Sequence, residues 1–330
     1  MLRIGLISFW HVHAPGYAKD ITNWEDTKVT AVWDELPARG QEWAEKLGAA
    51  FEADYDAFLA REDVDAVVCD APTTMHAELL GKAAAAGKHI FTEKLLTPGA
   101  AEGEALREAI RESGVTFTIS LPCRCSPEEL YIKSLVDAGA LGTVTGARFR
   151  RSHGGVCNHW LPDYWFDIAM SGGGSLMDLG AHPVYILAWL FGAPTRLTAL
   201  MNNHTKSMET TSDENAIALA EFPGGVLGTM ETGFLTNGVS DLLEVFGTKG
   251  SVFMRGGEVM QNLEGEALGL RKVEREEMPA ARPSPLRQFV DACLAGVKEP
   301  EGFGLEDALV MTRMIEASYR ADESGKTQAL

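Results

Sequence analysis

The first third of the chain alternates short apolar runs with segments of helical periodicity. The runs are apolar at nearly every position, as in strands buried on both faces of a parallel sheet. They predict strands at residues 3–8, 28–33, 66–69, 89–92 and 116–119. The segments between them predict helices at residues 16–21, 36–47, 55–60, 76–86 and 100–113. Repeated β-α-β units build a doubly wound parallel sheet, which binds ligands at the carboxyl ends of its strands.

The pattern changes after Pro122. Ser126 can cap a helix that runs to Gly139, and later runs alternate apolar with polar residues, as antiparallel strands do. These predict a hairpin of residues 215–222 and 226–232, strands at 242–247, 251–255 and 271–276, and closing helices at 285–294 and 305–321. We therefore expect an α/β chain with two domains. Residues 1–122 form the doubly wound domain, and residues 123–330 form an α+β domain with a mostly antiparallel sheet, whose last helices can pack back on the first domain.

The formal net charge of −18 restricts the possible partners. Nucleic acid and anionic membranes repel such a chain. No apolar run reaches membrane-spanning length and no secretory signal precedes the first strand, so we expect a cytoplasmic protein. The five cysteines form an odd, scattered set that favours reduced thiols. Cys123 and Cys125 have no matching second pair, so we expect no zinc site there.

The segment LISFWHVHAPGY, residues 6–17, follows the first predicted strand, where a dinucleotide-binding domain carries a glycine-rich turn. Bulky rings occupy the turn here. It still leads into a predicted helix, whose first N–H groups can hold a phosphate. Side chains of the turn can add further donors. We expect the pyrophosphate of a dinucleotide to lie against Ser8, Phe9, Trp10, His11 and His13 in a remodelled turn.

Asp34 ends the second predicted strand, VTAVWD. An acid at this position of a doubly wound domain accepts hydrogen bonds from the adenosine ribose hydroxyls. Glu35 adds a second negative charge, which repels the 2′-phosphate of NADP. The pair therefore favours NAD over NADP as the cofactor.

Two further segments carry groups that can move protons. Glu93 and Lys94 follow a buried strand, so Lys94 projects into the crevice at the carboxyl edge of the sheet, where burial lowers the pKa of a lysine. In GGGSLMDLGAHPVYILAWLFG, Asp178 and His182 are four residues apart. We expect them to share one face of a helix, where the carboxylate fixes the imidazole tautomer, with a kink at the following Pro183.

Four segments together resemble the Gfo/Idh/MocA oxidoreductase family: TEKL, GGGSLMDLGAHPVYILAWLFG, DAPTTMHAELLGKAAAAGKHI and ELYIKSLVDAGALGTVTGARF. The likeness covers nearly the whole chain in the right order. It implies an N-terminal Rossmann domain, a C-terminal domain whose open sheet makes the contacts of a dimer or tetramer, and NAD(P)-dependent oxidation or reduction of sugars and polyols. Lys94 matches the family's lysine, and Asp178 and His182 match its Asp-x-x-x-His pair.

The chain departs from the family pattern at three places. Leu95 replaces the proline that follows the lysine, and Tyr185 stands where the family often has an aspartate. Ser8, Trp10 and His13 lie about where the glycines of G-x-G-x-x-G belong. The cofactor turn is the largest of these departures.

The residues and the resemblance lead to one mechanism. His182 takes the hydroxyl proton as hydride leaves the carbon for nicotinamide C4, Asp178 orients the imidazole, and Lys94 polarises the oxygen. The expected cofactor-binding residues are Ser8, Phe9, Trp10, His11, His13, Asp34, Pro72, Thr73, His76, Glu93 and Lys94. The expected substrate contacts are Arg124, His153, Asn158, His159 and Trp165.

Two alternatives stay open on the sequence. Histidines one residue apart on a strand point to the same face, so His11 and His13 permit a metal-dependent hydrolase. That motif belongs in a (β/α)₈ barrel, which the antiparallel second half cannot close. A ligand sensor that has lost its cofactor also fits the altered turn. We expect the oxidoreductase, without a bound metal, acting on a sugar or polyol as a homo-oligomer.

Overall fold

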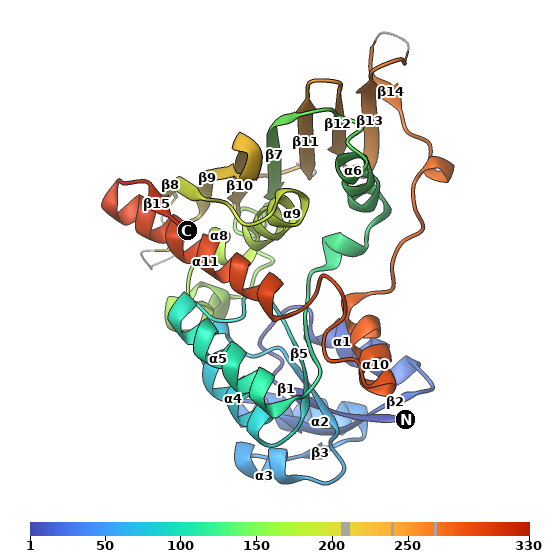
Figure 1. Cartoon of the computed structure of the whole chain (residues 1–330). Coiled ribbons are helices and arrows are strands. Elements are labelled where there is room, and N and C mark those ends of the chain that lie inside the picture. Colours follow the sequence, from blue (N-terminus) through green and yellow to red (C-terminus); the bar gives the residue numbers. More distant parts are fainter. Residues whose placement is uncertain (206–211, 239–240, 267–268) are drawn as a thin grey trace. The chain divides into compact units, whose positions relative to one another are not determined.

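A computed structural model describes residues 1–205, 212–238, 241–266 and 269–330 of the chain. The chain forms two compact units, each built on its own sheet (Figure 1). Unit 1 consists of Met1–Ser120 and Ser284–Leu309. Unit 2 consists of Leu121–Pro283 and Val310–Leu330.

Unit 1 is built on a parallel sheet with the strand order β3-β2-β1-β4-β5-β6. The strands are β1 (Leu2–Ile7), β2 (Thr27–Trp33), β3 (Ala50–Phe51), β4 (Ala66–Cys69), β5 (His89–Thr92) and β6 (Phe117–Ile119). The predicted parallel strands are confirmed, whereas β3 is too short to leave a hydrophobic pattern. The order reverses between β1 and β4, so the carboxyl ends of these strands flank the place where doubly wound sheets bind ligands.

The helices of unit 1 cover both faces of this sheet. They are α1 (Ala14–Asn23), α2 (Pro37–Leu47), α3 (Tyr55–Ala60), α4 (His76–Ala85), α5 (Ala100–Ser113) and α10 (Pro285–Ala295). Leu286, Phe289 and Val290 of α10 share a buried cluster with α1 and β1, and α4 packs against α5 on the other face (Figure 1). After α2 and α5 the chain turns through Gly48 and Gly114, with φ of 63° and 66°, a conformation that glycine adopts without strain.

Unit 2 is built on a mixed sheet with the strand order β14-β13-β12-β11-β7-β10-β9-β8-β15. The strands are β7 (Val144–Ser152), β8 (Arg196–Asn202), β9 (Asn215–Phe222), β10 (Val226–Gly233), β11 (Leu242–Gly247), β12 (Gly250–Arg255), β13 (Glu258–Leu263), β14 (Arg271–Lys272) and β15 (Gln328–Ala329). β7 and β10 are parallel and the other pairs are antiparallel, which confirms the predicted mostly antiparallel sheet. The sequence pattern misses β7, β8, β13 and β15. In β7 and β8, polar residues at the exposed positions dilute the apolar signal.

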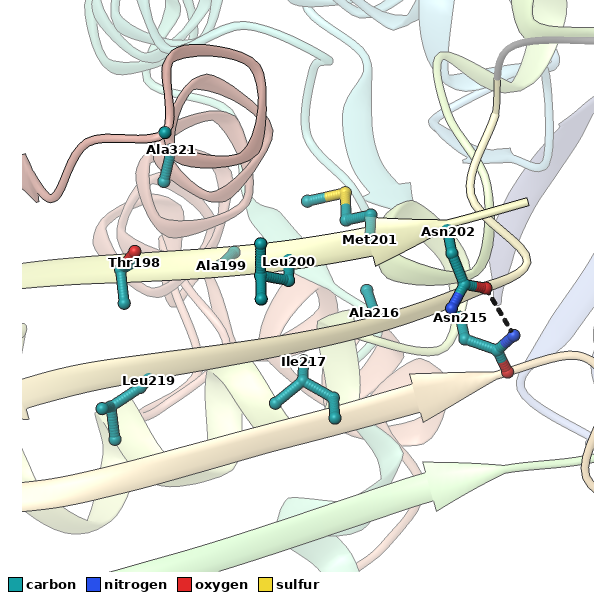
Figure 2. Close-up of a pocket in the computed structure, with 11 residues that line it drawn as sticks. Thr198, Ala199, Leu200, Met201, Asn202, Asn215, Ala216, Ile217, Leu219 and Ala321 are labelled. Carbon is teal, nitrogen blue, oxygen red and sulfur yellow. Dashed lines mark hydrogen bonds between the residues drawn. The ribbon is translucent and has the colours of Figure 1, made fainter. Parts of the chain in front are cut away.

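The helices of unit 2 are α6 (Pro127–Asp137), α7 (Ile168–Ser171), α8 (Ser175–Asp178), α9 (Ala181–Phe191) and the part of α11 (Leu305–Ser324) from Val310 onward. The apolar α9 packs on β7 and β10. On β8 and β9 every second residue points away from the core, and Leu200 and Ile217 are 76% and 54% exposed (Figure 2). None of the described helices combines the length and apolar character of a membrane span.

Candidate active site

The turn after β1 keeps the backbone of a glycine-rich loop without its glycines. Ser8 has a φ of 70°, the left-handed conformation that glycine adopts freely and other residues rarely. Its N–H donates to the Trp33 carbonyl at 2.7 Å, and its Oγ accepts the Trp10 N–H at 3.0 Å. The serine hydroxyl thus stabilises a turn for which the sequence shows no glycine.

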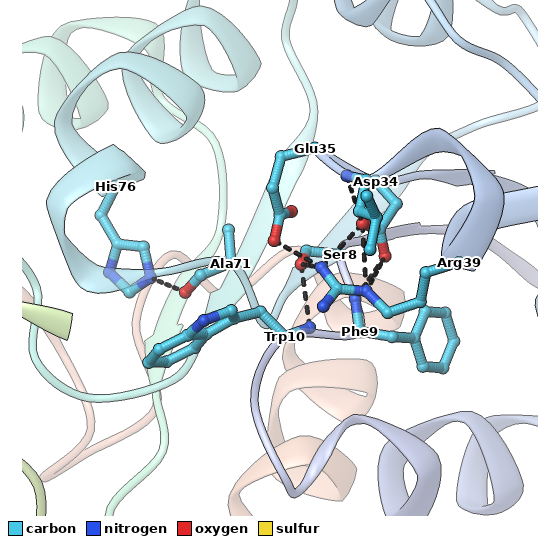
Figure 3. A network of polar contacts seen from close by, with 9 residues as sticks. Ser8, Phe9, Trp10, Asp34, Glu35, Arg39, Ala71 and His76 are labelled. Carbon is cyan, nitrogen blue, oxygen red and sulfur yellow. Dashed lines mark hydrogen bonds and ion pairs between the residues drawn. The ribbon is translucent and has the colours of Figure 1, made fainter. Parts of the chain in front are cut away.

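The two rings after Ser8 are buried. Phe9 stacks on Trp43 of α2 with ring centroids 4.3 Å apart. Trp10 is similarly buried, and in Figure 3 its ring extends toward Ala71 while the Phe9 ring points the other way. Their backbone N–H groups bond within the protein, Phe9 to Asp34 at 2.9 Å and Trp10 to the serine hydroxyl. These two N–H groups are therefore already bonded where a glycine-rich turn would offer them to a phosphate.

Asp34 lies at the end of β2, as predicted, and its carboxylate is surrounded by donors. It accepts the N–H groups of Phe9 and Leu36, at 2.9 and 2.8 Å. Arg39 of α2 forks onto both of its oxygens, with contacts of 2.7 to 3.1 Å. The same guanidinium also binds Glu35 and reaches Ser8 Oγ at 3.4 Å (Figure 3). Arg39 therefore occupies the carboxylate oxygens with which Asp34 would accept the hydroxyls of a ribose.

A second polar cluster joins the turn to the end of β5. His13 Nδ1 lies 2.9 Å from Glu93 Oε1, and the Tyr17 hydroxyl donates to the same oxygen. Tyr17 also contacts Ser120 Oγ at 2.8 Å. His11 Nδ1 accepts the His13 N–H at 3.2 Å. The structure thus brings together His11, His13 and Glu93, three residues that the sequence predicts near the cofactor.

The charges in this cluster balance one another. Burial alone raises the pKa of Glu93, but His11, His13 and Lys94 outweigh burial and hold that pKa well below its usual range. Nearby Asp70 has the opposite shift, since burial and then the Glu93 charge raise its pKa well above the usual range. Glu93 is therefore the ionised carboxylate of the pair.

Lys94 follows Glu93 at the end of β5 and is buried. Its backbone N–H donates to Glu93 Oε2 at 3.2 Å, and the peptide bond to Leu95 is cis. His76, at the start of α4, contacts the carbonyls of Leu95 and Ala71 at 2.7 and 3.0 Å. Burial lowers the pKa of this histidine.

His76 therefore links α4 to the segment that carries Lys94. Pro72 and Thr73 lie between β4 and α4, where Pro72 accepts the Met75 N–H at 2.9 Å and Thr73 is buried. Both lie in unit 1, as do all of the predicted cofactor-binding residues.

Asp178 and His182 lie in unit 2 on successive helices. The predicted kinked helix is divided into two helices, because α8 ends at Asp178 and α9 begins at Ala181. Pro183 has no N–H to donate to the Leu179 carbonyl, which accepts the His182 N–H at 3.1 Å instead. The break thus lies just before the histidine rather than at the proline.

The structure places the Tyr185 hydroxyl against the His182 ring. His182 Nδ1 lies 2.8 Å from the Tyr185 hydroxyl and 3.5 Å from Cys123 Sγ. The hydroxyl accepts the Cys123 N–H at 3.1 Å, and Arg151 Nη1 donates to Cys123 Sγ at 2.8 Å. Burial raises the pKa of Tyr185 well above its usual range, so the phenol stays neutral.

A cavity of about 310 Å³ adjoins this group within unit 2. Its lining includes Cys123 and Arg151, together with the acidic residues Glu129 and Asp241. Arg151 Nη1 lies 3.4 Å from Asp241 Oδ2. Burial raises the pKa of Glu129 to about 7. The cavity therefore offers both donors and acceptors of hydrogen bonds to a bound ligand.

The predicted substrate contacts in unit 2 have mixed surroundings. Arg124 is buried under α9, donates to the Tyr185 carbonyl at 3.0 Å and lies over the Trp189 ring. Trp165 is a buried core residue. Both positions fit structural roles better than contact with a ligand.

The other three predicted contacts lie in one loop after β7. The His153 ring stacks on Phe234 with centroids 5.3 Å apart. Asn158 and His159 lie in an exposed part of the loop, and Asn158 Nδ2 donates to Asn237 Oδ1 at 3.3 Å. The side chains of this loop are therefore more exposed than those of Arg124 and Trp165.

Several members of these clusters carry no functional signal in the sequence. Tyr17, Ser120 and Arg39 join the groups in unit 1, and Tyr185 and Cys123 join the histidine in unit 2. The one available signal was Tyr185, which departs from the family pattern three residues after the histidine. The others meet their partners only through the fold.

Fold and site together define a dinucleotide-binding oxidoreductase with a separate mixed-sheet domain. Residues 4–121 match the model of the oxidoreductase family with an NAD-binding Rossmann fold, and residues 130–253 match the GFO/IDH/MocA C-terminal domain. The chain belongs to the GFO/IDH/MocA family of oxidoreductases.

The relatives with similar sequences include a dehydrogenase and a reductase. The chain is 29% identical over 264 residues to scyllo-inositol 2-dehydrogenase (NAD(+)) of Bacillus subtilis (strain 168), covering 77% of this chain and 72% of the relative. It is 32% identical over 178 residues to dTDP-3,4-didehydro-2,6-dideoxy-alpha-D-glucose 3-reductase of Streptomyces violaceoruber, covering 54% and 51%.

Among solved structures, levoglucosan dehydrogenase in complex with NADH and levoglucosan superposes with a TM-score of 0.87 at 19% identity, covering 99% of both chains. The aldose-aldose oxidoreductase of Caulobacter crescentus, complexed with glycerol, gives a TM-score of 0.84 at 24% identity, covering 100% of this chain and 99% of the other. At these identities the likeness establishes the fold.

The predicted fold class, family, oxidoreductase activity and use of NAD are confirmed. The family match favours the oxidoreductase over the metal-dependent hydrolase and the cofactor-free sensor.

Proposed function

We propose that this protein transfers hydride between NAD and a hydroxyl-bearing carbon of a sugar, polyol or related compound. The observation that carries the proposal is the retained dinucleotide turn. In this turn Ser8 has a φ of 70°, and the Asp34 carboxylate accepts the N–H of Phe9. The dehydrogenase and reductase relatives, named for an inositol and a deoxysugar, support this substrate class.

The residues of unit 1 fit the two halves of a dinucleotide. The carboxylates of Asp34 and Glu35 accept the ribose hydroxyls once Arg39 moves off Asp34. The pyrophosphate would lie beside the exposed side chain of His13, because the N–H groups of Phe9, Trp10 and His11 already bond within the protein. When bound, the nicotinamide supplies the hydride acceptor or donor.

Proton transfer falls to side chains of the protein itself. In the oxidative direction His182 accepts the hydroxyl proton at Nε2, so its ring proton has to be on Nδ1. Nδ1 then donates to the Tyr185 hydroxyl, which also accepts the Cys123 N–H. The O–H of Tyr185 in turn donates a hydrogen bond to the Cys123 sulfur. We therefore assign to Tyr185 the orienting role expected of Asp178. Asp178 stays the predicted second partner of the histidine, and Lys94 polarises the substrate oxygen.

We further propose a homo-oligomer, a dimer or tetramer, formed through the open face of β8 and β9. Leu200, Ile217 and Leu219 line this face beside a cavity of about 480 Å³ (Figure 2). Exposed aliphatic patches of this kind mark interaction surfaces, and an isologous contact would bury the patch of both copies. Leu200→Glu with Ile217→Glu should lower the mass measured by light scattering to that of one chain, and an unchanged oligomer would reject this face. The five free cysteines support a reducing compartment such as the cytoplasm.

The hydride-transfer proposal is tested by calorimetric titration with NAD⁺, NADH and NADP⁺, followed by an activity screen over inositols, aldoses and sugar acids. We expect NAD⁺ or NADH to bind and at least one polyol or sugar to be turned over with NAD. A sensor would bind a ligand without turnover. The absence of both heat and turnover at millimolar nucleotide would overturn the proposal.

A further inference from the structure

We propose that His11, His13 and Glu93 form a binding site for a divalent transition-metal ion of the Zn²⁺ class at the turn after β1. The ligand atoms of these three side chains all lie within 4.8 Å of one another. Two imidazoles and one carboxylate are a common protein ligand set for such ions. The sequence shows only the two histidines, because Glu93 is 80 residues further along the chain.

The spacing of the three groups suits one ion. Bonds of about 2.0–2.1 Å to a tetrahedral ion place neighbouring ligand atoms about 3.3 Å apart. His13 Nδ1 and Glu93 Oε1 are separated by 2.9 Å, so a slight opening of this pair admits the ion. The ligand atom of His11 lies within 4.8 Å of the other two ligand atoms. It therefore moves inward by up to about 1.5 Å to reach the spacing of a tetrahedral site.

Hydrogen bonds from neighbouring residues fix the orientation of the Glu93 carboxylate. Glu93 is 1% exposed, and Tyr17 donates to one of its oxygens while the Lys94 N–H donates to the other. Such bonds from outside the ligand set orient a ligand and are part of a working metal site. Tyr17 in turn bonds to Ser120, so the carboxylate is held from two sides.

A second observation, an unpartnered buried oxygen, also points to a ligand at this turn. Asp70 is 1% exposed, and its Oδ1 has no hydrogen-bond partner in the part of the chain that the structure describes. Its carbonyl accepts the His11 N–H at 3.0 Å, which places this buried carboxyl next to the proposed ligands. A buried carboxyl oxygen without a hydrogen-bond partner is costly, and an ion bound beside it, or a water on that ion, supplies such a partner.

The site also has an entrance and an open position. His11 and Glu93 are buried, whereas the His13 side chain is 46% exposed. An ion can therefore enter from the side of His13, and water can complete a tetrahedron on that side.

The ion has a consequence that rests on the proposed function. The pyrophosphate of NAD is proposed to lie beside His13, at the same turn. An ion that draws His13 toward Glu93 removes that contact, so metal and NADH should weaken each other's binding.

Co²⁺ is the probe for the site, because a tetrahedral Co²⁺ ion absorbs visible light and Zn²⁺ displaces it. Titration of the metal-free protein should give one Co²⁺ per chain with a visible band that Zn²⁺ abolishes. His11→Ala and His13→Ala should each weaken binding by more than the about 10- to 100-fold that loss of an outer partner costs. His204→Ala, which removes an exposed histidine of unit 2, is the matched control and should bind like the wild type.

His13 is exposed, so its variant should fold even if changes at the buried ligands do not. A protein that takes up no Co²⁺, or a His13→Ala variant that binds it as the wild type does, would overturn the metal site. NADH fluorescence titrations with and without Zn²⁺ then test the coupling. If NADH fails to bind at all, the proposed function fails while the Co²⁺ result stands. If NADH binds equally with and without Zn²⁺, the coupling is overturned.

Discussion

The Tyr185 hydroxyl lies 2.8 Å from Nδ1 of His182, one turn earlier on α9. Both side chains are buried, and the same hydroxyl accepts the Cys123 backbone N–H. A phenol held in this way can fix the imidazole tautomer as a carboxylate does, but without adding a negative charge. The histidine should therefore be less basic than one paired with an aspartate.

Tyr185→Phe tests this relationship. It removes one oxygen and keeps the ring, so we expect kcat to fall about 10- to 100-fold, less than the full contribution of a general base. KM should change little, and the pH profile of kcat should shift, because the tautomer of His182 is no longer fixed. Tyr55→Phe is the matched control, since it removes another buried hydroxyl, bonded to the Leu79 carbonyl in unit 1. Equal pH profiles for wild type and Tyr185→Phe would refute the orienting role.

Lys94→Ala and His182→Ala should each lower kcat/KM by about 100-fold or more on the substrate found by screening, because each removes a group proposed to act on the reacting oxygen. Steady-state kinetics with NAD⁺ measures the loss. Lys46→Ala, at an exposed lysine of α2, should leave the rate unchanged. Full turnover by both active-site variants would show that other residues transfer the proton of the reacting hydroxyl.

Ser8→Gly and Ser8→Ala separate backbone strain from the lost hydroxyl. Both variants remove the hydrogen bond that the Trp10 N–H donates, but only glycine adopts a φ of 70° without strain. We expect the glycine variant to be more stable than the alanine variant by about 1 kcal/mol in urea unfolding. Equal stabilities would mean that the left-handed conformation of this residue carries no strain.

Glu35→Gln should weaken the preference for NAD over NADP. The change removes a negative charge that repels a 2′-phosphate and leaves Arg39, which binds Glu35 and Asp34, free to meet that phosphate. The ratio of kcat/KM with NAD⁺ to that with NADP⁺ should fall about 10-fold, the effect of about 1.4 kcal/mol. Glu42→Gln, on the exposed side of α2, is the control for a general charge effect. An unchanged ratio would remove Glu35 from cofactor selection.

Glu129→Gln should change how stability depends on pH. Burial raises the pKa of Glu129 in the folded protein to about 7, above the 4.5 of an exposed glutamate. Its protonated form is favoured by folding, so this stability is fully present below pH 4.5 and is lost as the pH rises toward 7. The amide variant should flatten this part of the curve and gain up to about 3 kcal/mol at pH 8 relative to the wild type. Parallel curves for both proteins, from urea unfolding between pH 4 and 8, would show that Glu129 ionises normally.

The parallel half of the fold could be predicted closely from the sequence. Strands β4 and β5 and helices α3 and α5 lie at or within one residue of their predicted positions, because buried strands and glycine-ended helices have strong local patterns. β7 could not be found in this way. It carries Thr, Gly and Arg at its partly exposed positions and pairs with β10, which is more than 70 residues away.

The sequence by itself determined the doubly wound domain, the acid at the end of β2, and the lysine and histidine that match the family, because each depends on local periodicity or on a short motif. Only the tertiary structure decided what surrounds those groups. It placed Arg39 on Asp34, Glu93 beside His13, and Tyr185 against a ring nitrogen of His182. Hydrogen-bond partners depend on distances of a few tenths of an ångström between distant parts of the chain, and such distances are set by packing rather than by residue spacing.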